Sequence, residues 1–294
     1  MQSWLVRLSW LAIPFTAGSA IADALGHRSS PVQVTAAVLL WSGWAAVVVG
    51  LLVPRPAGLV GVRVGAVAAA LLVVWAADSA LDWWVAGSHA VVMLALALAP
   101  ETGEWLVNGT AYGYERRYLL RPPGALVAGP LALSSVALPA AVLTGPLLLA
   151  SHQWVAGAVA IVLGAPLAFV LARALHSVAV RWAVLVPAGF VLKDHLSLLD
   201  PVLFRRTDIE VLRAAPADTN ALDLTAGALG LALELRLRGP QRIDRMRPVR
   251  RGAEPYEADA LLCTPTRPRA LLADAASRRI RVDAMPPPKT ASPS

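Results

Sequence analysis

The sequence predicts an all-α membrane bundle of about six helices, followed by a small, mainly-β domain that ends in a helix. Two observations carry this prediction. The 294 residues are 57% hydrophobic and 15% charged, whereas an average soluble domain has about 25% charged residues. Residues 1–175 also hold only eight of the 26 Lys/Arg and six of the 19 Asp/Glu residues. We therefore expect a transmembrane domain over 1–175, a β-rich domain over 176–282 and a disordered tail over 283–294.

Six apolar stretches have the length of a membrane span or come near it. A spanning helix needs about 20 mostly apolar residues. The stretches are Trp4–Leu25, Gln33–Val53, Gly58–Ala77, Trp83–Ala99, Ala125–Ala150 and Trp154–Leu175. The fourth is the shortest and contains Ser88 and His89, so it could be re-entrant. Glycines predict close packing of the second and third spans: Gly43, Gly50, Gly58, Gly61 and Gly65.

The basic residues predict an orientation. Cytoplasmic loops of membrane proteins carry an excess of Lys and Arg. With a cytoplasmic N-terminus, six spans leave only Arg28 in an outside loop. The arginines then placed inside are Arg7, Arg55, Arg63, Arg116, Arg117 and Arg121. We expect both termini in the cytoplasm of a bacterial plasma membrane.

After His176 the pattern changes to alternation. The clearest strand is Leu231–Leu237, in which every second residue is leucine, as expected for a strand with one buried face. Arg238-Gly239-Pro240 predicts its end, and residues 245–257 are expected to form a loop. Shorter strands are expected at 178–186, 190–193, 202–204, 209–212 and 258–263, and a helix at about Arg269–Arg279.

This order of short strands and one final helix resembles a pleckstrin-homology-like (PH-like) domain. The resemblance covers residues 178–280. It rests on the Ala188–Leu192 turn and strand, the step from Pro201–Phe204 to Ile209, the Leu231–Leu237 strand and the last helix. It implies a barrel, and bacterial versions often follow membrane helices. Domains of this class bind lipids, bind proteins or have no known ligand, so the resemblance does not fix an activity. The whole chain is similar to actinobacterial multi-pass membrane proteins, in line with an arginine-rich composition in which only Lys193 and Lys289 are lysines.

One basic cluster precedes the fifth span. Arg116, Arg117 and Arg121 lie beside Tyr118. Basic residues near the cytoplasmic leaflet attract anionic lipids, and tyrosine fits the headgroup layer. These four residues are therefore candidates for binding a lipid headgroup. The alternative is an ordinary positive-inside anchor.

A second basic group lies in the β-rich domain. Arg205, Arg206, Arg236 and Arg238 predict a surface that binds a protein partner or anionic lipid. The alternative is a solvated strand face. Nucleic acid is not expected, because no recognition helix, zinc finger or aromatic-basic RNA motif is present.

Weak metal candidates lie near the predicted outer interface. Asp78 and Asp82 are four residues apart, and His89 follows. Ionisable residues near membrane depth are candidates for function. The alternative, which the sequence favours, is that these residues are hydrated helix ends. No catalytic motif and no cofactor motif is present. Cys263 is the only cysteine, so no disulfide can form within the chain.

These observations favour a non-enzymatic membrane protein that anchors a cytoplasmic PH-like domain. The expected partners are the lipid bilayer and a protein partner or a second copy of the chain. Two alternatives stay open: a transporter or transporter subunit, and a membrane enzyme acting on a lipid-linked substrate.

Overall fold

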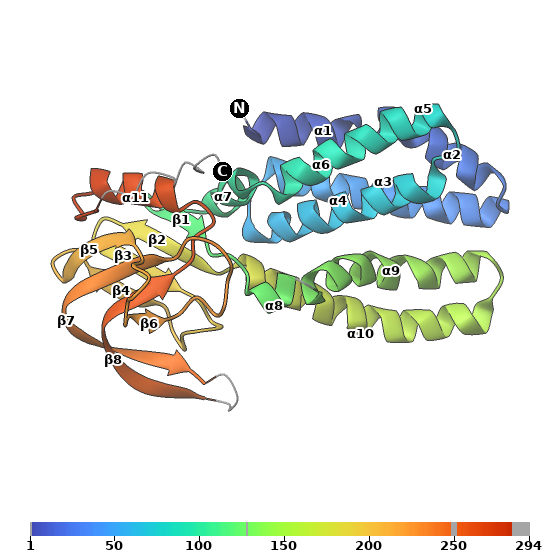
Figure 1. Ribbon diagram of the computed structural model, residues 1–294. Helices are drawn as coiled ribbons and strands as arrows, with labels where there is room; N and C mark the ends of the chain where they lie inside the picture. The colour runs from blue at the N-terminus through green and yellow to red at the C-terminus, as the bar shows by residue number, and fades with distance from the viewer. Residues whose placement is uncertain (1, 128, 248–251, 284–294) are drawn as a thin grey trace, which may run out of the picture. The chain divides into compact units, whose positions relative to one another are not determined.

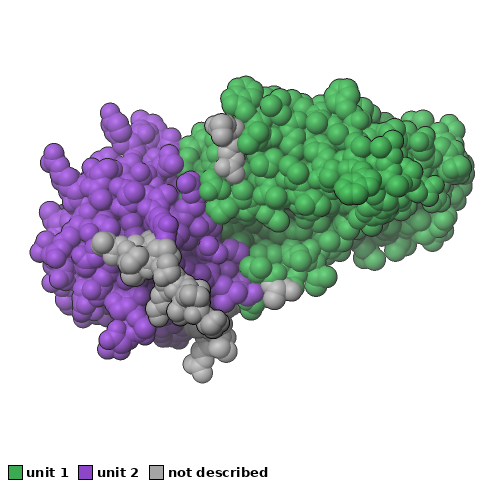
Figure 2. Space-filling view, turned by 45° about the horizontal axis from the view of Figure 1, so that its top comes forward, with its two compact units in different colours: residues 1–110, 125–180 green, residues 111–124, 181–294 purple. Residues whose placement is uncertain are grey.

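A computed structural model describes residues 2–127, 129–247 and 252–283, so the tail predicted over 283–294 lies outside the described residues except for Asp283. The chain divides into two compact units (Figure 1, Figure 2). The helical unit comprises residues 1–110 and 125–180, and the β unit comprises residues 111–124 and 181–294. Segment 111–124, which we assigned to the transmembrane domain, therefore lies in the β unit.

Six segments of the helical unit are long and apolar enough to cross a membrane, which confirms the prediction of a multi-pass membrane protein. They are Ser3–Gly26, Ser30–Leu52, Pro56–Ala76, Ala80–Leu98, Gly124–Ala150 and Trp154–Ala179. The fourth has 19 residues, and about 17 to 25 suffice to span. Its length therefore does not require a re-entrant path.

Several spans consist of more than one helix. The first contains α1 (Gln2–Thr16) and α2 (Gly18–Gly26). The fourth contains α5 (Ala80–Asp82), a π-helical turn η1 (Trp83–Gly87) and α6 (Ser88–Leu98). The other helices of this unit are α3 (Ser30–Leu52), α4 (Pro56–Ala76), α7 (Pro100–Asn108), α8 (which starts at Gly124 and ends at Val127), α9 (Pro130–Ala150) and α10 (Trp154–Ala179).

Glycines allow neighbouring helices to approach closely. Helices α9 and α10 form a hairpin (Figure 1), and a Cβ atom added at Gly157 would lie 2.6 Å from the Leu149 side chain. Between α3 and α4, a Cβ at Gly58 would lie 2.9 Å from the Gly50 carbonyl oxygen. The predicted packing role therefore holds for Gly50, Gly58 and Gly65. It is wrong for Gly43 and Gly61, where an added Cβ meets nothing within 4 Å.

The first sheet of the β unit is an antiparallel meander. Its strands are β1 (Arg116–Leu119), β2 (Trp182–Val186), β3 (Gly189–Lys193) and β4 (Val202–Arg205), in that order. Strand β1 pairs with β2, with Arg116 opposite Leu185 and Leu119 opposite Trp182. The α9–α10 hairpin is thus inserted between two strands that are hydrogen-bonded to each other.

The second sheet has the order β5-β7-β8-β6. Its strands are β5 (Ile209–Ala214), β6 (Leu222–Asp223), β7 (Leu233–Met246) and β8 (Ala253–Cys263). The predicted strand end at 238–240 is wrong. The predicted loop over 245–257 is wrong for residues 245–246 and 253–257, which lie in β7 and β8, and its residues 248–251 lie outside the described residues. Strand β7 continues through a bulge between Arg236 and Gln241, and a bulge is where a strand tolerates Gly and Pro. Beyond it, Arg242 pairs with Glu257 and Arg245 with Glu254, so opposite charges face each other across the ribbon.

The two sheets and helix α11 (Pro268–Ser277) share one apolar core. Phe190 and Phe204 contribute from the first sheet, Leu235 from the second and Leu271 from the helix, and all four are fully buried. Neither sheet closes on itself within the described residues. The structure therefore supports a small β domain with a C-terminal helix, without establishing a PH-like barrel.

Candidate functional site

Three turns of the β unit meet at one edge and bring together Arg205, Arg206 and Arg238. The backbone N–H of Arg206, in the β4–β5 turn, donates to the Ala188 carbonyl in the β2–β3 turn at 2.8 Å. The N–H of Arg238, in the β7 bulge, donates to the Asp208 carbonyl at 2.9 Å. Residues far apart in the sequence therefore share one edge, which we call the arginine rim (Arg205, Arg206, Arg238).

Gly189 makes the close approach of two of these turns possible. Its φ angle is +153°, and an added Cβ would lie 2.1 Å from the Phe204 carbonyl oxygen. Any larger residue would force the β2–β3 turn away from the backbone of Arg206. The rim therefore depends on this glycine as well as on its arginines.

The rim carries positive charge that the described residues do not neutralise. All three arginines are exposed, and none forms an ion pair with another described side chain. The carboxylate of Asp208 lies at this edge, where it accepts hydrogen bonds from Thr207 and Gln241. Free guanidinium groups bind carboxylate or phosphate through two parallel hydrogen bonds. The rim therefore has the chemistry of an anion-binding surface.

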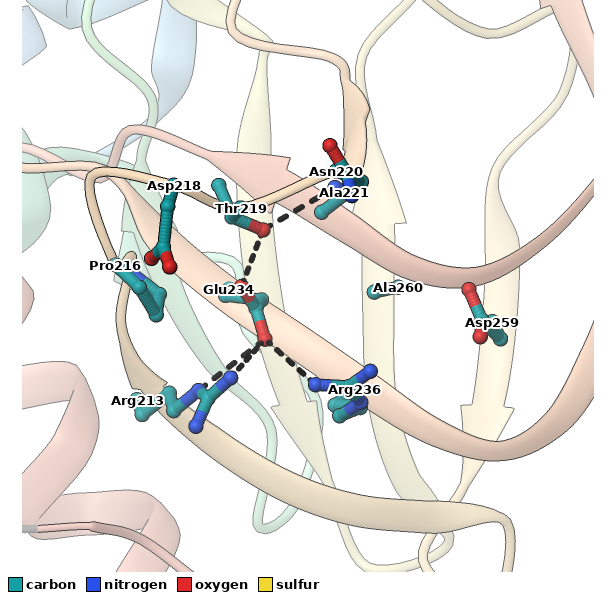
Figure 3. A pocket seen from close by; sticks show the side chains of 10 residues that line it. All are labelled: Arg213, Pro216, Asp218, Thr219, Asn220, Ala221, Glu234, Arg236, Asp259 and Ala260. Carbon is teal, nitrogen blue, oxygen red and sulfur yellow. Dashed lines mark hydrogen bonds and ion pairs between the residues drawn. The ribbon is translucent and has the colours of Figure 1, made fainter.

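Arg236, predicted together with the rim arginines, lies in a separate pocket. It lies 3.9 Å from the Glu210 carboxylate and 3.9 Å from that of Glu234. The pocket has a volume of about 400 Å³ (Figure 3). It is lined by Arg213, Pro216, Asp218, Thr219, Asn220, Ala221, Glu234, Arg236, Asp259 and Ala260.

Glu234 organises this pocket. Its carboxylate is 1% exposed, and one oxygen accepts hydrogen bonds from Arg213 Nε at 3.1 Å and Nη2 at 2.8 Å. The other oxygen accepts a bond from Thr219 Oγ1 at 2.6 Å. Thr219 Oγ1 in turn accepts the N–H of Ala221 at 3.1 Å. The buried carboxylate thus fixes the 216–221 loop over the outer face of the second sheet.

The four candidates for a lipid headgroup, Arg116, Arg117, Tyr118 and Arg121, all lie in or next to β1. Tyr118 is fully buried, and its hydroxyl donates to the carboxylate of Asp274 in α11. Its ring is therefore part of the core and is not accessible to a headgroup. Arg116 is half-exposed, 3.8 Å from the same carboxylate.

Arg117 and Arg121 are likewise engaged within the β unit. Arg117 forms a 2.7 Å hydrogen bond with Glu115 and lies 4.9 Å from the centre of a Trp182 ring. This bond holds the pKa of the Glu115 carboxyl below its ordinary value. The backbone N–H of Arg121 donates to the Thr264 carbonyl at 2.8 Å. The Arg121 Nε atom is buried and has no hydrogen-bond partner among the described residues. The Arg117 side chain and the Arg121 backbone thus fasten β1 to its neighbours, and the headgroup hypothesis remains a prediction.

The structure does not bring Asp78, Asp82 and His89 together as a metal centre. Asp82 caps its own short helix, accepting hydrogen bonds from the Ser79 hydroxyl at 2.7 Å and the Ser79 N–H at 3.1 Å. Within the part of the chain that is described, no three His, Cys, Asp or Glu side chains group closely enough to hold a metal ion.

His89 instead lies between two hydroxyl groups of α1. Its Nε2 is 3.0 Å from Ser9 Oγ, and its Nδ1 is 2.6 Å from Thr16 Oγ1. An ionisable residue inside a membrane span with named polar partners is a candidate for function. Neither partner was predicted from the sequence, although two hydroxyls seven residues apart on an apolar helix are a recognisable signal.

A buried ion pair was also missed. Arg181 and Asp194 are 1% and 0% exposed and share two hydrogen bonds of 2.6 Å. Arg181 Nη1 also donates to the Arg121 carbonyl at 3.2 Å. In the β2–β3 hairpin, Trp182 lies opposite Lys193. The same register, continued by one residue in each direction, places Arg181 opposite Asp194, so a correct hairpin register would have predicted the ion pair.

Asp194, His195 and Ser197 lie close together in the sequence, but the structure does not arrange them as a catalytic triad. The Asp194 carboxylate is bound to Arg181, and Ser197 Oγ donates to the Leu224 carbonyl at 3.0 Å. Burial lowers the pKa of His195, but no hydrogen bond joins its ring to Ser197 among the described residues. At Cys263, burial raises the pKa of the thiol to about 12, so it is not a nucleophile at neutral pH.

Comparisons with protein-family models, curated proteins and solved structures give no match to this chain. The functional conclusion therefore rests on the geometry described above.

Proposed function

We propose that this chain is a membrane-anchored docking protein whose arginine rim binds an acidic segment of a cytoplasmic partner protein. The observation that carries the proposal is the convergence of three exposed arginines without an ion pair among the described residues. Such a surface attracts acidic ligands and speeds their association. The protein is non-enzymatic, and both termini lie in the cytoplasm of a bacterial cell.

We propose a protein segment in preference to a lipid because three exposed guanidinium groups along one edge suit an extended ligand that carries several carboxylates. A lipid headgroup is the alternative ligand, and the test below separates the two.

The β unit is proposed to be PH-like. Four antiparallel strands in chain order, a second sheet and a C-terminal helix that packs on the shared core support this assignment. In this proposal the actinobacterial resemblance of the whole chain describes a group of multi-pass proteins that present such a domain to the cytoplasm.

The test uses the full chain in nanodiscs of neutral lipid, with labelled poly-glutamate as the probe. The rim variant Arg206→Glu/Arg238→Glu reverses two charges at the rim. The control Arg269→Glu/Arg281→Glu reverses two exposed charges elsewhere on the β unit. We expect the rim variant to weaken poly-glutamate binding at least tenfold, about 1.4 kcal/mol, and the control to change it little.

Two results would overturn the proposal. Equal weakening by both variants would mean that poly-glutamate responds only to net charge. Binding of the wild type to phosphatidylserine vesicles but not to poly-glutamate, with the vesicle binding lost in the rim variant, would make the rim a lipid site.

A further inference from the structure

The pocket around Glu234 contains several polar side chains without a charged partner among the described residues. Asp218, Asn220 and Asp259 are exposed and form no ion pair with any described residue. Within the described part of the chain, the ion pairs of Arg236 are two contacts of 3.9 Å, with Glu210 and with Glu234. These groups line one open pocket, so several polar side chains around it are free to form hydrogen bonds with a ligand.

The floor of the pocket presents a cation with free donors. Glu234 accepts two short hydrogen bonds from Arg213, which compensates that guanidinium. Arg236 shares the same carboxylate oxygen only at 3.9 Å and has five N–H donors. The Arg236 guanidinium is therefore available to bind a carboxylate in a bidentate manner.

The opposite wall presents anions. Figure 3 shows Asp218 and Asn220, from the loop fixed by Thr219, on one side of Glu234, and Arg213 and Arg236 on the other. Asp259 adds a second carboxylate at one end. Carboxylates that have no ion-pair partner bind ammonium groups through charge-assisted hydrogen bonds. The pocket thus presents the Arg236 guanidinium on one side, the Asp218 carboxylate on the other side and the Asp259 carboxylate at one end.

We propose that this pocket binds a free basic amino acid. A ligand of this class carries a carboxylate for Arg236, and two cationic groups for Asp218 and Asp259. The cavity volume of about 400 Å³ lies at the small end of the range for ligand sites, about 300 to 1,000 Å³. The pocket is separate from the arginine rim, so the inference does not rest on the docking function.

The test is calorimetric titration of the full chain in detergent with L-lysine. L-norleucine lacks the side-chain ammonium group, and cadaverine lacks the carboxylate. We expect lysine to bind at least tenfold more tightly than either, because a hydrogen bond between charged groups is worth about a factor of ten or more.

Variants assign the two sides of the pocket. Arg236→Gln is expected to weaken lysine binding at least tenfold and to leave cadaverine binding unchanged, since cadaverine has no carboxylate. Asp218→Asn/Asp259→Asn is expected to weaken both ligands. Arg269→Gln, on the exposed surface of α11, is the matched control and should change neither.

Folding is checked in each variant by the protection of Cys263, which is buried, from maleimide. Absence of lysine binding in the folded wild type would overturn the proposal. Unchanged lysine affinity in folded Arg236→Gln would also overturn it, because the carboxylate would then be bound elsewhere. Poly-glutamate binding by the rim is measured separately, so the two proposals can fail independently.

Discussion

The two units differ in where many of their large apolar side chains lie, on the surface in the helical unit and in the core in the β unit. In the helical unit, Phe15 is 88% exposed and Val155 is 80% exposed, whereas Ala66, between helices, is fully buried. In the β unit, Phe190 and Phe204 are fully buried. Many large apolar side chains of the helical unit are therefore exposed, although some, such as Leu59, are buried, whereas the large apolar side chains of the β unit form a core.

The difference follows from the surroundings that each unit is built for. Water drives large apolar groups into a core, as in the β unit. Lipid tails supply no such force between helices, so association depends on close contact across small residues. Close contacts at glycines, such as Gly157 with Leu149, therefore hold the helices together, whereas buried side chains such as Phe190 hold the two sheets together.

The largest expected effect is the loss of β1 from the β unit. Residues 181–294 alone lack Tyr118, Leu119 and Leu120, which are at most 5% exposed in the protein. Burial of each large apolar side chain contributes about 1.5 to 3 kcal/mol, so the sum approaches the total stability of a typical domain, about 5 to 15 kcal/mol. We expect this fragment to be unfolded by circular dichroism and its Cys263 to react with maleimide.

A second, matched fragment restores the strand. Residues 111–124 joined to 181–294 by a short Gly/Ser linker keep β1 next to β2, because Leu119 already lies opposite Trp182. This chain is expected to fold and to protect Cys263. If Cys263 is equally protected from maleimide in the fragment without β1, then the core of the β unit does not depend on the apolar side chains of β1, and this account of its stability is wrong.

The next effect concerns the one deeply buried ion pair of the described β unit. Asp194→Ala leaves the 1% exposed Arg181 without its counter-charge, and breaking a buried pair from one side costs about 3 to 5 kcal/mol. We expect Cys263 of the full chain to become reactive at a lower urea concentration. The double variant Arg181→Met/Asp194→Leu should recover most of that loss, because it leaves no unpaired charge. A wild-type urea profile for Asp194→Ala would contradict this account.

The smallest expected effect is a change in the thermal stability of the helical unit when a single methyl group is added between two helices. Gly157→Ala adds a Cβ that would lie 2.9 Å from the Leu149 backbone nitrogen, and overpacking costs about 1 to 3 kcal/mol. Gly43→Ala is the control, since nothing lies within 4 Å of the added atom and alanine favours the helix. Thermal unfolding in detergent, followed by tryptophan fluorescence, should show a lower Tm for Gly157→Ala only. Equal Tm values would mean that small-residue contacts do not hold the hairpin together.

The sequence predicts the helical unit well because its signal is local. Each span is identified by the length and composition of a continuous segment, and all six were found within a few residues of their bounds. The last helix and the core of β7 are also local patterns. The arginine rim was partly predicted, since Arg205, Arg206 and Arg238 were grouped by charge.

What the sequence did not predict depends on contacts between distant residues. Strand β1 has only four residues, and two of them are arginines. Without knowledge of its partner β2, such a segment looks like a basic loop beside the cytoplasmic leaflet rather than a strand. The bulge in β7 is invisible because Gly239-Pro240 usually ends a strand. Arg236 was grouped with the rim, yet its pocket forms only when the loop carrying Thr219 folds over Glu234.

The insertion of α9 and α10 between β1 and β2 dictates an order of events during synthesis. The ribosome releases β1 first, and its hydrogen-bonding partner emerges only after residues 125–180 have been translated. An unpaired strand edge invites wrong pairing until then. The first sheet of the β unit can therefore be completed only after both helices of the α9–α10 hairpin have been synthesised, and a chain that stalls before β2 leaves β1 without its partner strand.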